Sequence, residues 1–149
     1  MPASPRIGFF RSRAELESPD VQLTLVPFAI DSVRKRQMAK WPGLTVAMYP
    51  LRPQSTGSIH IKSASAAQQP AINFNLLSAA LDRETIVAGQ KYTPQLIEAN
   101  ALAEYLSAEL KPGPDVRTDD ELLAWTRANA ETAYHPVGTC KMSADPMAV

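Results

Sequence analysis

The sequence of 149 residues has few of the residues that build metal, disulfide and nucleotide sites: one Cys, two His and six Gly. A single Cys cannot form an internal disulfide, so no oxidising compartment is implied. Two His and one Cys cannot supply the four paired ligands of structural zinc, so we expect no bound metal. No two glycines form a GxG motif. The dinucleotide fingerprint and the phosphate-binding loop are therefore both missing from this sequence.

Net charge and long apolar runs are lacking as well. Fifteen basic residues balance fifteen acidic ones, so no overall field favours nucleic acid or an anionic membrane. No apolar run approaches the roughly 20 residues that span a bilayer. Residues 1–20 do not resemble a secretory signal, because their apolar stretch is short and Arg11 and Arg13 follow it at once. We therefore expect a cytoplasmic protein with no transmembrane segment and no nucleic-acid partner.

What the sequence does contain, in its first half, is a series of short strand patterns. Its length and its 45% hydrophobic content suit one globular domain. Apolar and polar residues alternate with the period of half-buried strands at 21–30, 44–51, 58–63 and 71–77. The connections are too short for crossover helices, so we predict an antiparallel or mixed sheet with one apolar and one polar face.

Helical patterns begin near Asp82, which is predicted to be the N-cap of a helix. Pro94 should kink or break this helix near Thr93, because proline lacks an N–H group and its ring clashes with the preceding turn. Strands followed by helices predict an α+β domain, in which a mostly antiparallel sheet is flanked by helices.

A second helix is predicted to start at Thr118, which forms a capping-box pattern with Glu121. An apolar stripe follows, with its members three residues apart: Leu122, Trp125 and Ala128. This stripe should face the core.

The segment AYHPVGTCKM, residues 133–142, holds one of the two histidines and the cysteine. The second helix should end before it, because Pro136 disfavours a helical conformation at His135. Pro136 and Gly138 shape the backbone, so a side chain here can point into a cleft from a fixed position. Imidazole exchanges protons near neutral pH, which makes His135 the candidate catalytic residue. The alternative is a structural histidine that caps the carbonyl groups of the preceding helix.

The other reactive side chains have simpler interpretations. His60 alternates with Ile59 and Ile61 and is interpreted as a solvated strand position. Cys140 would lie up to about 17 Å from His135 in an extended segment, so we interpret it as a small packed residue and not as half of a dyad. Tyr134 is expected in the core or in a pocket wall, where it is the candidate substrate-binding residue.

Several blocks of the sequence resemble, in the usual order, the substrate domain of the glucose–methanol–choline (GMC) oxidoreductases, a family of FAD-dependent flavoproteins. The blocks are PDVQLTLVP, LRPQSTGSIHIKSA, PAINFNLLS, DRETIVAG and PGPDVRTDDELLAWTRANAETAYHPVGT, then CKMS and DP. They cover roughly residues 15–149. The resemblance implies a largely antiparallel sheet flanked by helices and the oxidation of an alcohol to an aldehyde or ketone. His135 would take the hydroxyl proton while a hydride passes to FAD.

The sequence departs from the family pattern at both ends. The Rossmann segment that binds FAD has no counterpart, and the chain stops at DPMAV, before the family's second catalytic His or Asn. We therefore expect residues 1–149 to form one truncated substrate-binding and catalytic domain, which alone is inactive and does not bind FAD. A small alcohol and a separate flavin-binding chain or domain are the implied partners. Two alternatives stay open: a stand-alone module that binds a small ligand or a protein without catalysis, and an assembly element that docks onto a flavin domain.

Overall fold

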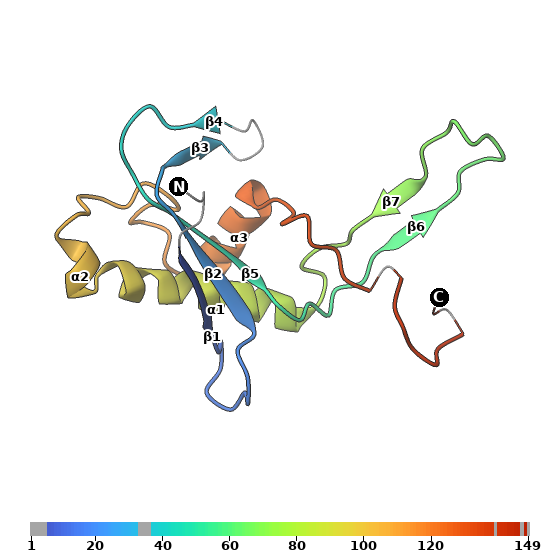
Figure 1. Ribbon diagram of the computed structural model, residues 1–149, viewed down its shortest axis with the longest axis horizontal. Coiled ribbons are helices and arrows are strands. Elements are labelled where there is room, and N and C mark those ends of the chain that lie inside the picture. The colour runs from blue at the N-terminus through green and yellow to red at the C-terminus, as the bar shows by residue number, and fades with distance from the viewer. Residues whose placement is uncertain (1–5, 33–36, 139, 147, 149) are drawn as a thin grey trace.

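The computed structural model describes residues 6–32, 37–138, 140–146 and 148. In this part of the chain seven strands precede three helices (Figure 1). The strands are β1 (Arg6–Phe10), β2 (Val21–Val26), β3 (Ile30–Ser32), β4 (Gln37–Met38), β5 (Thr45–Pro50), β6 (Ser58–His60) and β7 (Ala71–Asn73). The helices are α1 (Ala80–Ile97), α2 (Asn100–Ala103) and α3 (Asp119–Asn129). The predicted α+β order is confirmed, and none of the described helices has the length and apolar character to cross a membrane.

The central element is a three-stranded antiparallel sheet with the strand order β1–β2–β5. Leu23 of β2 lies opposite Gly8 of β1 and Met48 of β5, so these three residues share one face. Helix α1 covers this face and approaches it closely at Gly89. A Cβ atom added there would lie 2.8 Å from the Sδ atom of Met48. Glycine thus allows the helix backbone to come close to the sheet, and the alternation of β2 buries Val21 and Leu23 beneath it.

The four strands predicted from alternation are all present and antiparallel, but they do not form one sheet. The first two pair with each other, and β1, which was not predicted, adds to them. The other two, β6 and β7, form a separate hairpin that extends away from the rest of the molecule (Figure 1). The paired Ile59 and Ile72 are 56% and 55% exposed, because no described layer covers them. The expected apolar face is therefore open in this hairpin.

Helix α1 begins three residues earlier than predicted. Ala79, not Asp82, occupies the N-cap position, and Ala79 has no side chain that can cap. The hydroxyl of Ser55 accepts the N–H group of Ala79 at 3.1 Å instead. Of the predicted kink or break near Thr93, the break is wrong, because Pro94 lies in the last turn and the helix continues to Ile97. The helix tolerates this proline although it lacks the N–H group that would donate to the carbonyl four residues earlier.

Helix α3 has the predicted capping box. The Thr118 hydroxyl accepts the N–H group of Glu121 at 3.3 Å, and the Glu121 carboxylate accepts the N–H group of Thr118 at 2.9 Å. Leu122 is buried in the core, as predicted. Ala128 is exposed, whereas Thr126 is buried. The prediction that Ala128 faces the core is therefore wrong. The buried Thr126 hydroxyl is satisfied, because it donates to the carbonyl of Leu122 at 2.8 Å.

Candidate active site

The candidate catalytic residue, His135, lies against the sheet. Helix α3 ends at Asn129, as predicted, and the irregular segment that follows brings the imidazole to Tyr49 of β5. The two rings are nearly perpendicular, with an interplanar angle of 84° and centroids 5.9 Å apart. Edge-to-face contacts at such distances are favourable for aromatic pairs. The fold therefore joins a residue near the C-terminus to β5, an edge strand of the central sheet.

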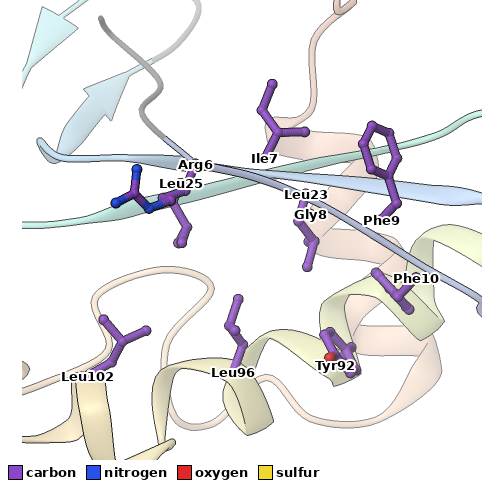
Figure 2. Close-up of a pocket in the computed structure, with 10 residues that line it drawn as sticks. All are labelled: Arg6, Ile7, Gly8, Phe9, Phe10, Leu23, Leu25, Tyr92, Leu96 and Leu102. Carbon is purple, nitrogen blue, oxygen red and sulfur yellow. The ribbon is translucent and has the colours of Figure 1, made fainter. Parts of the chain in front are cut away.

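The strand register shows which face of the sheet His135 approaches. Tyr49 lies opposite Gln22, and Gln22 lies opposite Phe9, so these residues form one row across β5, β2 and β1. Successive residues of a strand point to opposite faces. This row is therefore on the side opposite Leu23 and helix α1. In Figure 2, Phe9 points away from α1, whereas Leu23 points towards it.

We call this side of the sheet the open face. Its members are Ile7, Phe9, Gln22, Thr24, Ala47 and Tyr49. They are exposed or half-buried, and Ile7 and Phe9 are each 57% exposed. None of the six carries a formal charge at neutral pH, while Gln22 and Thr24 offer polar groups between apolar ones. This composition suits contact with a small organic molecule or with an apolar surface.

The structure speaks against the helix-capping alternative for His135. The Nδ2 atom of Asn129 donates to the carbonyl of Trp125 at 2.9 Å, and the N–H group of Ala130 donates to the carbonyl of Thr126 at 2.7 Å. Neither bond involves the imidazole, and no described hydrogen bond joins His135 to a carbonyl group of α3. His135 is exposed, and its contact with Tyr49 is the one interaction of the ring seen among the described residues. A nitrogen of the imidazole is thus available for proton transfer.

Tyr134 is not a core residue: its side chain is 69% exposed. Its backbone is in the left-handed region with φ of 59°, and its N–H group donates to the Thr132 hydroxyl at 3.1 Å. Gly138 also has a positive φ, of 78°. These two turns shape the segment on either side of His135 and Pro136. A role for Tyr134 in substrate binding stays a prediction.

The remaining reactive residues lie apart from His135 and Tyr49. His60 is exposed on β6, as predicted. Cys140 is a free thiol and is exposed, so its predicted packed position is wrong. The physical reason is that residues 140–146 are all exposed and give it no packing layer. Among the described residues, no group of three or more His, Cys, Asp or Glu could hold a metal ion.

Asp82 anchors the connection between β5 and β6 to helix α1. Its buried carboxylate accepts the N–H groups of Gln54 at 2.8 Å and Ser55 at 2.7 Å. Burial alone would raise the pKa of this carboxyl, but hydrogen bonds from the Ser55 side chain and from the two N–H groups hold the pKa below its usual value. The carboxylate is therefore charged at neutral pH and fixes the loop that leads into the β6–β7 hairpin.

A cavity lies on the opposite side of the sheet, between β1, β2 and helices α1 and α2. It has a volume of about 380 Å³ and is mostly apolar (Figure 2). Its lining includes Phe10, Leu23, Leu25, Tyr92, Leu96 and Leu102. The rings of Phe10 and Tyr92 stack with centroids 4.3 Å apart. Neither His135 nor Tyr49 lines this cavity, so it is not part of the candidate active site.

Sequence reasoning found His135 but missed its partner, Tyr49, and the open face. A signal for Tyr49 was present, because it alternates with Met48 in the strand pattern 44–51 and so had to point away from the core. The contact itself joins two distant parts of the chain. Alternation within a strand predicts the face of the sheet on which a residue lies. It does not predict which distant residue contacts it.

A family model described as GMC oxidoreductase matches residues 53–149. The alcohol dehydrogenase [acceptor] of Pseudomonas putida is 39% identical over 142 residues, which cover 95% of this chain and 26% of that protein. The oxygen-dependent choline dehydrogenase of Cronobacter sakazakii is also 39% identical over 142 residues and is covered to 25%. This chain thus spans about a quarter of the length of these curated relatives.

Solved structures show the same fold. Pyridoxine 4-oxidase from Mesorbium loti superposes with a TM-score of 0.82 at 21% identity, over 97% of this chain and 28% of that one. A formate oxidase of Aspergillus oryzae, described in terms of its FAD modification, superposes with a TM-score of 0.65 at 25% identity, over 85% of this chain and 22% of that one. The antiparallel sheets with flanking helices are therefore an arrangement shared with these larger oxidases.

Proposed function

This chain belongs to the GMC oxidoreductase family, and from that premise we propose that it is the substrate-binding and catalytic domain of an FAD-dependent alcohol oxidoreductase. The observation that carries the proposal is the position of His135. It lies in the segment that resembles the family's catalytic motif, and its exposed imidazole meets the open face through Tyr49. This position beside an uncharged surface supports a role for His135 as the proton acceptor.

The proposed reaction converts an alcohol to an aldehyde or ketone. His135 accepts the hydroxyl proton, because a neutral imidazole is a base suited to neutral pH. Bound FAD would supply the hydride acceptor that oxidation of the carbinol carbon requires. The open face contacts the body of the alcohol and excludes water from one side of it. Its neutral side chains support a small alcohol as the substrate class.

The start of helix α1 does not provide a cradle for the FAD diphosphate. Such a cradle needs free N–H groups at the start of a helix that follows a glycine-rich turn. At α1, however, Ser55 already accepts the N–H group of Ala79, and the Asp82 carboxylate would repel a phosphate. We therefore propose that a flavin-binding part outside these 149 residues, on the same or a separate chain, holds FAD.

Reconstitution tests this proposal. The chain would be co-expressed with the remaining part of the Pseudomonas putida relative, and assembly would be followed by flavin absorbance in gel filtration. Reduction of an artificial electron-accepting dye by a series of small primary alcohols then measures turnover. His135→Ala should lower kcat about 10²- to 10⁴-fold, the usual contribution of a positioned acid or base.

The matched control is His60→Ala, which removes the other, solvated histidine and should leave turnover unchanged. An assembled, flavin-loaded complex in which His135→Ala is as active as the wild type would contradict the role of His135. An assembled complex that oxidises no alcohol would contradict the proposed reaction. Separately, saturable binding of FAD by the chain alone, measured by fluorescence anisotropy, would contradict the assignment of FAD to another part of the protein.

A further inference from the structure

The segment that carries His135 makes few described contacts that could fix the orientation of the imidazole. Residues 131–135 are in no helix or strand and are exposed. Within this stretch the Tyr134 N–H group donates to the Thr132 hydroxyl, and this bond fixes the backbone, not the imidazole. The side-chain torsions of an exposed histidine are free to rotate unless something holds the ring. The described interaction that can hold it is the contact with Tyr49.

Tyr49, in contrast, is well anchored. It lies in β5, pairs with Gln22 of the central strand and is half-buried. Its neighbour Met48 packs on the other face beneath Gly89 of α1, which fixes the strand at this point. The position of the tyrosine ring is therefore fixed. The histidine ring contacts it with an interplanar angle of 84°. A perpendicular contact restricts both the direction and the plane of the imidazole.

We propose that Tyr49 is the positioning residue of His135: it holds the imidazole over the open face so that one nitrogen is aimed at the alcohol. The catalytic importance of this contact rests on the proposed function, but the contact itself can be measured without enzymatic turnover. Proton transfer requires the base within about 2.6–3.2 Å of the oxygen that it deprotonates, so small errors in ring placement are costly. Tyr49 acts through its ring, so its hydroxyl is dispensable.

The chain offers a clean test because His135 and His60 are its two histidines. NMR of the isolated chain, with isotope-labelled imidazoles, gives one set of ring signals for each. In the wild type, His135 should show NOEs to the Tyr49 ring and ring-current-shifted signals. Tyr49→Leu should abolish the NOEs and move the His135 signals towards those of exposed His60. Tyr49→Phe, which keeps the ring, should preserve both features.

The matched control is Tyr134→Leu, which removes the exposed ring adjacent in sequence and should leave the NOEs between residues 135 and 49 intact. Folding of every variant is checked by NOEs between the stacked rings of Phe10 and Tyr92. If Tyr49→Leu does not fold, the other ring of the pair is removed instead. In His135→Leu the NMR signals of the Tyr49 ring should then shift. The inference would be overturned if the His135 signals did not change in Tyr49→Leu. It would also be overturned if the wild type showed no NOE between the rings of His135 and Tyr49.

These outcomes are separate from those of the proposed function. A missing ring contact would overturn the positioning role and leave the reconstituted turnover to be judged by itself. An inactive assembled complex with an intact ring contact would count against the proposed reaction alone. In an active complex, Tyr49→Leu should lower kcat more than it raises KM, while Tyr49→Phe should stay near the wild type.

Discussion

Asp82 and Ser55 are joined by a reciprocal arrangement between helix α1 and the loop before β6. The Asp82 carboxylate accepts the Ser55 N–H group at 2.7 Å, while the Ser55 hydroxyl accepts the N–H group of Ala79 at 3.1 Å. The helix thus holds the loop, and the loop caps the helix. This pair fixes the point from which the β6–β7 hairpin leaves the body of the molecule.

Replacing Asp82 by Ala should destabilise the chain by about 3 kcal/mol, because two N–H groups lose a charged acceptor in a buried position. Asp82→Asn keeps one acceptor oxygen and should cost about half as much. Urea unfolding followed by circular dichroism gives these values. Glu84→Ala is the control, since Glu84 is exposed in the same turn and should change stability by less than about 0.5 kcal/mol. Equal losses for Ala at positions 82 and 84 would contradict the anchoring role.

The contribution of Asp82 should also depend on pH. Its pKa in the folded chain lies below the usual 3.8, so the unfolded chain binds the proton more readily. The stabilisation is therefore complete above the unfolded value and is lost as the pH falls through the folded one. The stability difference between the wild type and Asp82→Asn should be constant from pH 7 to about 5 and should shrink towards pH 3. Urea unfolding across this range measures it, and a difference that stays constant down to pH 3 would refute the prediction.

Gly57 should be intolerant of any side chain. A Cβ atom there would lie 2.0 Å from the carbonyl oxygen of Asn73 and 2.8 Å from that of Phe74, and neither backbone group can move without shifting β7. Gly57→Ala should therefore disrupt the pairing of Ser58 with Asn73, with an overall cost of about 1–3 kcal/mol. Amide exchange in β6 and β7 would reveal the loss. Gly8→Ala is the control, because its nearest neighbour would be 4.0 Å away, and comparable exchange in both variants would contradict the argument.

The β6–β7 hairpin should make the isolated chain self-associate. Ile61 is 87% exposed and Phe74 is 60% exposed, and together with Ile59 and Ile72 they form an apolar surface. Contiguous apolar surfaces of this kind promote association in water. Ile61→Lys combined with Phe74→Lys should lower the weight-average mass seen by sedimentation at high protein concentration. Met142→Lys, at a 96% exposed site outside the hairpin, is the control. A self-association equally reduced by Met142→Lys would show that the hairpin is not its source.

Local patterns predicted the elements better than their arrangement. Alternation placed β2 and β5, and the Thr118–Glu121 capping box placed the start of α3, because the signals for these features lie within a few residues. Strand β1 was missed because RIGFF has a glycine and no polar alternation. The start of α1 was misplaced because its capping group, Ser55, is 24 residues away from Ala79.

The same limit applies to the candidate site. The chemistry of imidazole and the motif around it singled out His135, and the strand period put Tyr49 on the side away from the core. No local signal could bring the two rings together, because their contact depends on how the segment after α3 returns to the sheet. Cys140 was expected to be packed because its distance from His135 in an extended segment excluded a dyad, but residues 140–146 are all exposed and supply no neighbours to pack against it.

The division of the sheet into a covered side and an open face has a practical consequence for engineering. Along β2, Val21 and Leu23 are buried, whereas Gln22 and Thr24 are half-buried on the other side. A library randomised at positions 22, 24 and 47 would therefore vary the surface offered to a ligand without opening a cavity beneath α1. Ligand selectivity could therefore be changed at these positions with little loss of stability. Successive rounds of mutation would then not need compensating, stabilising substitutions.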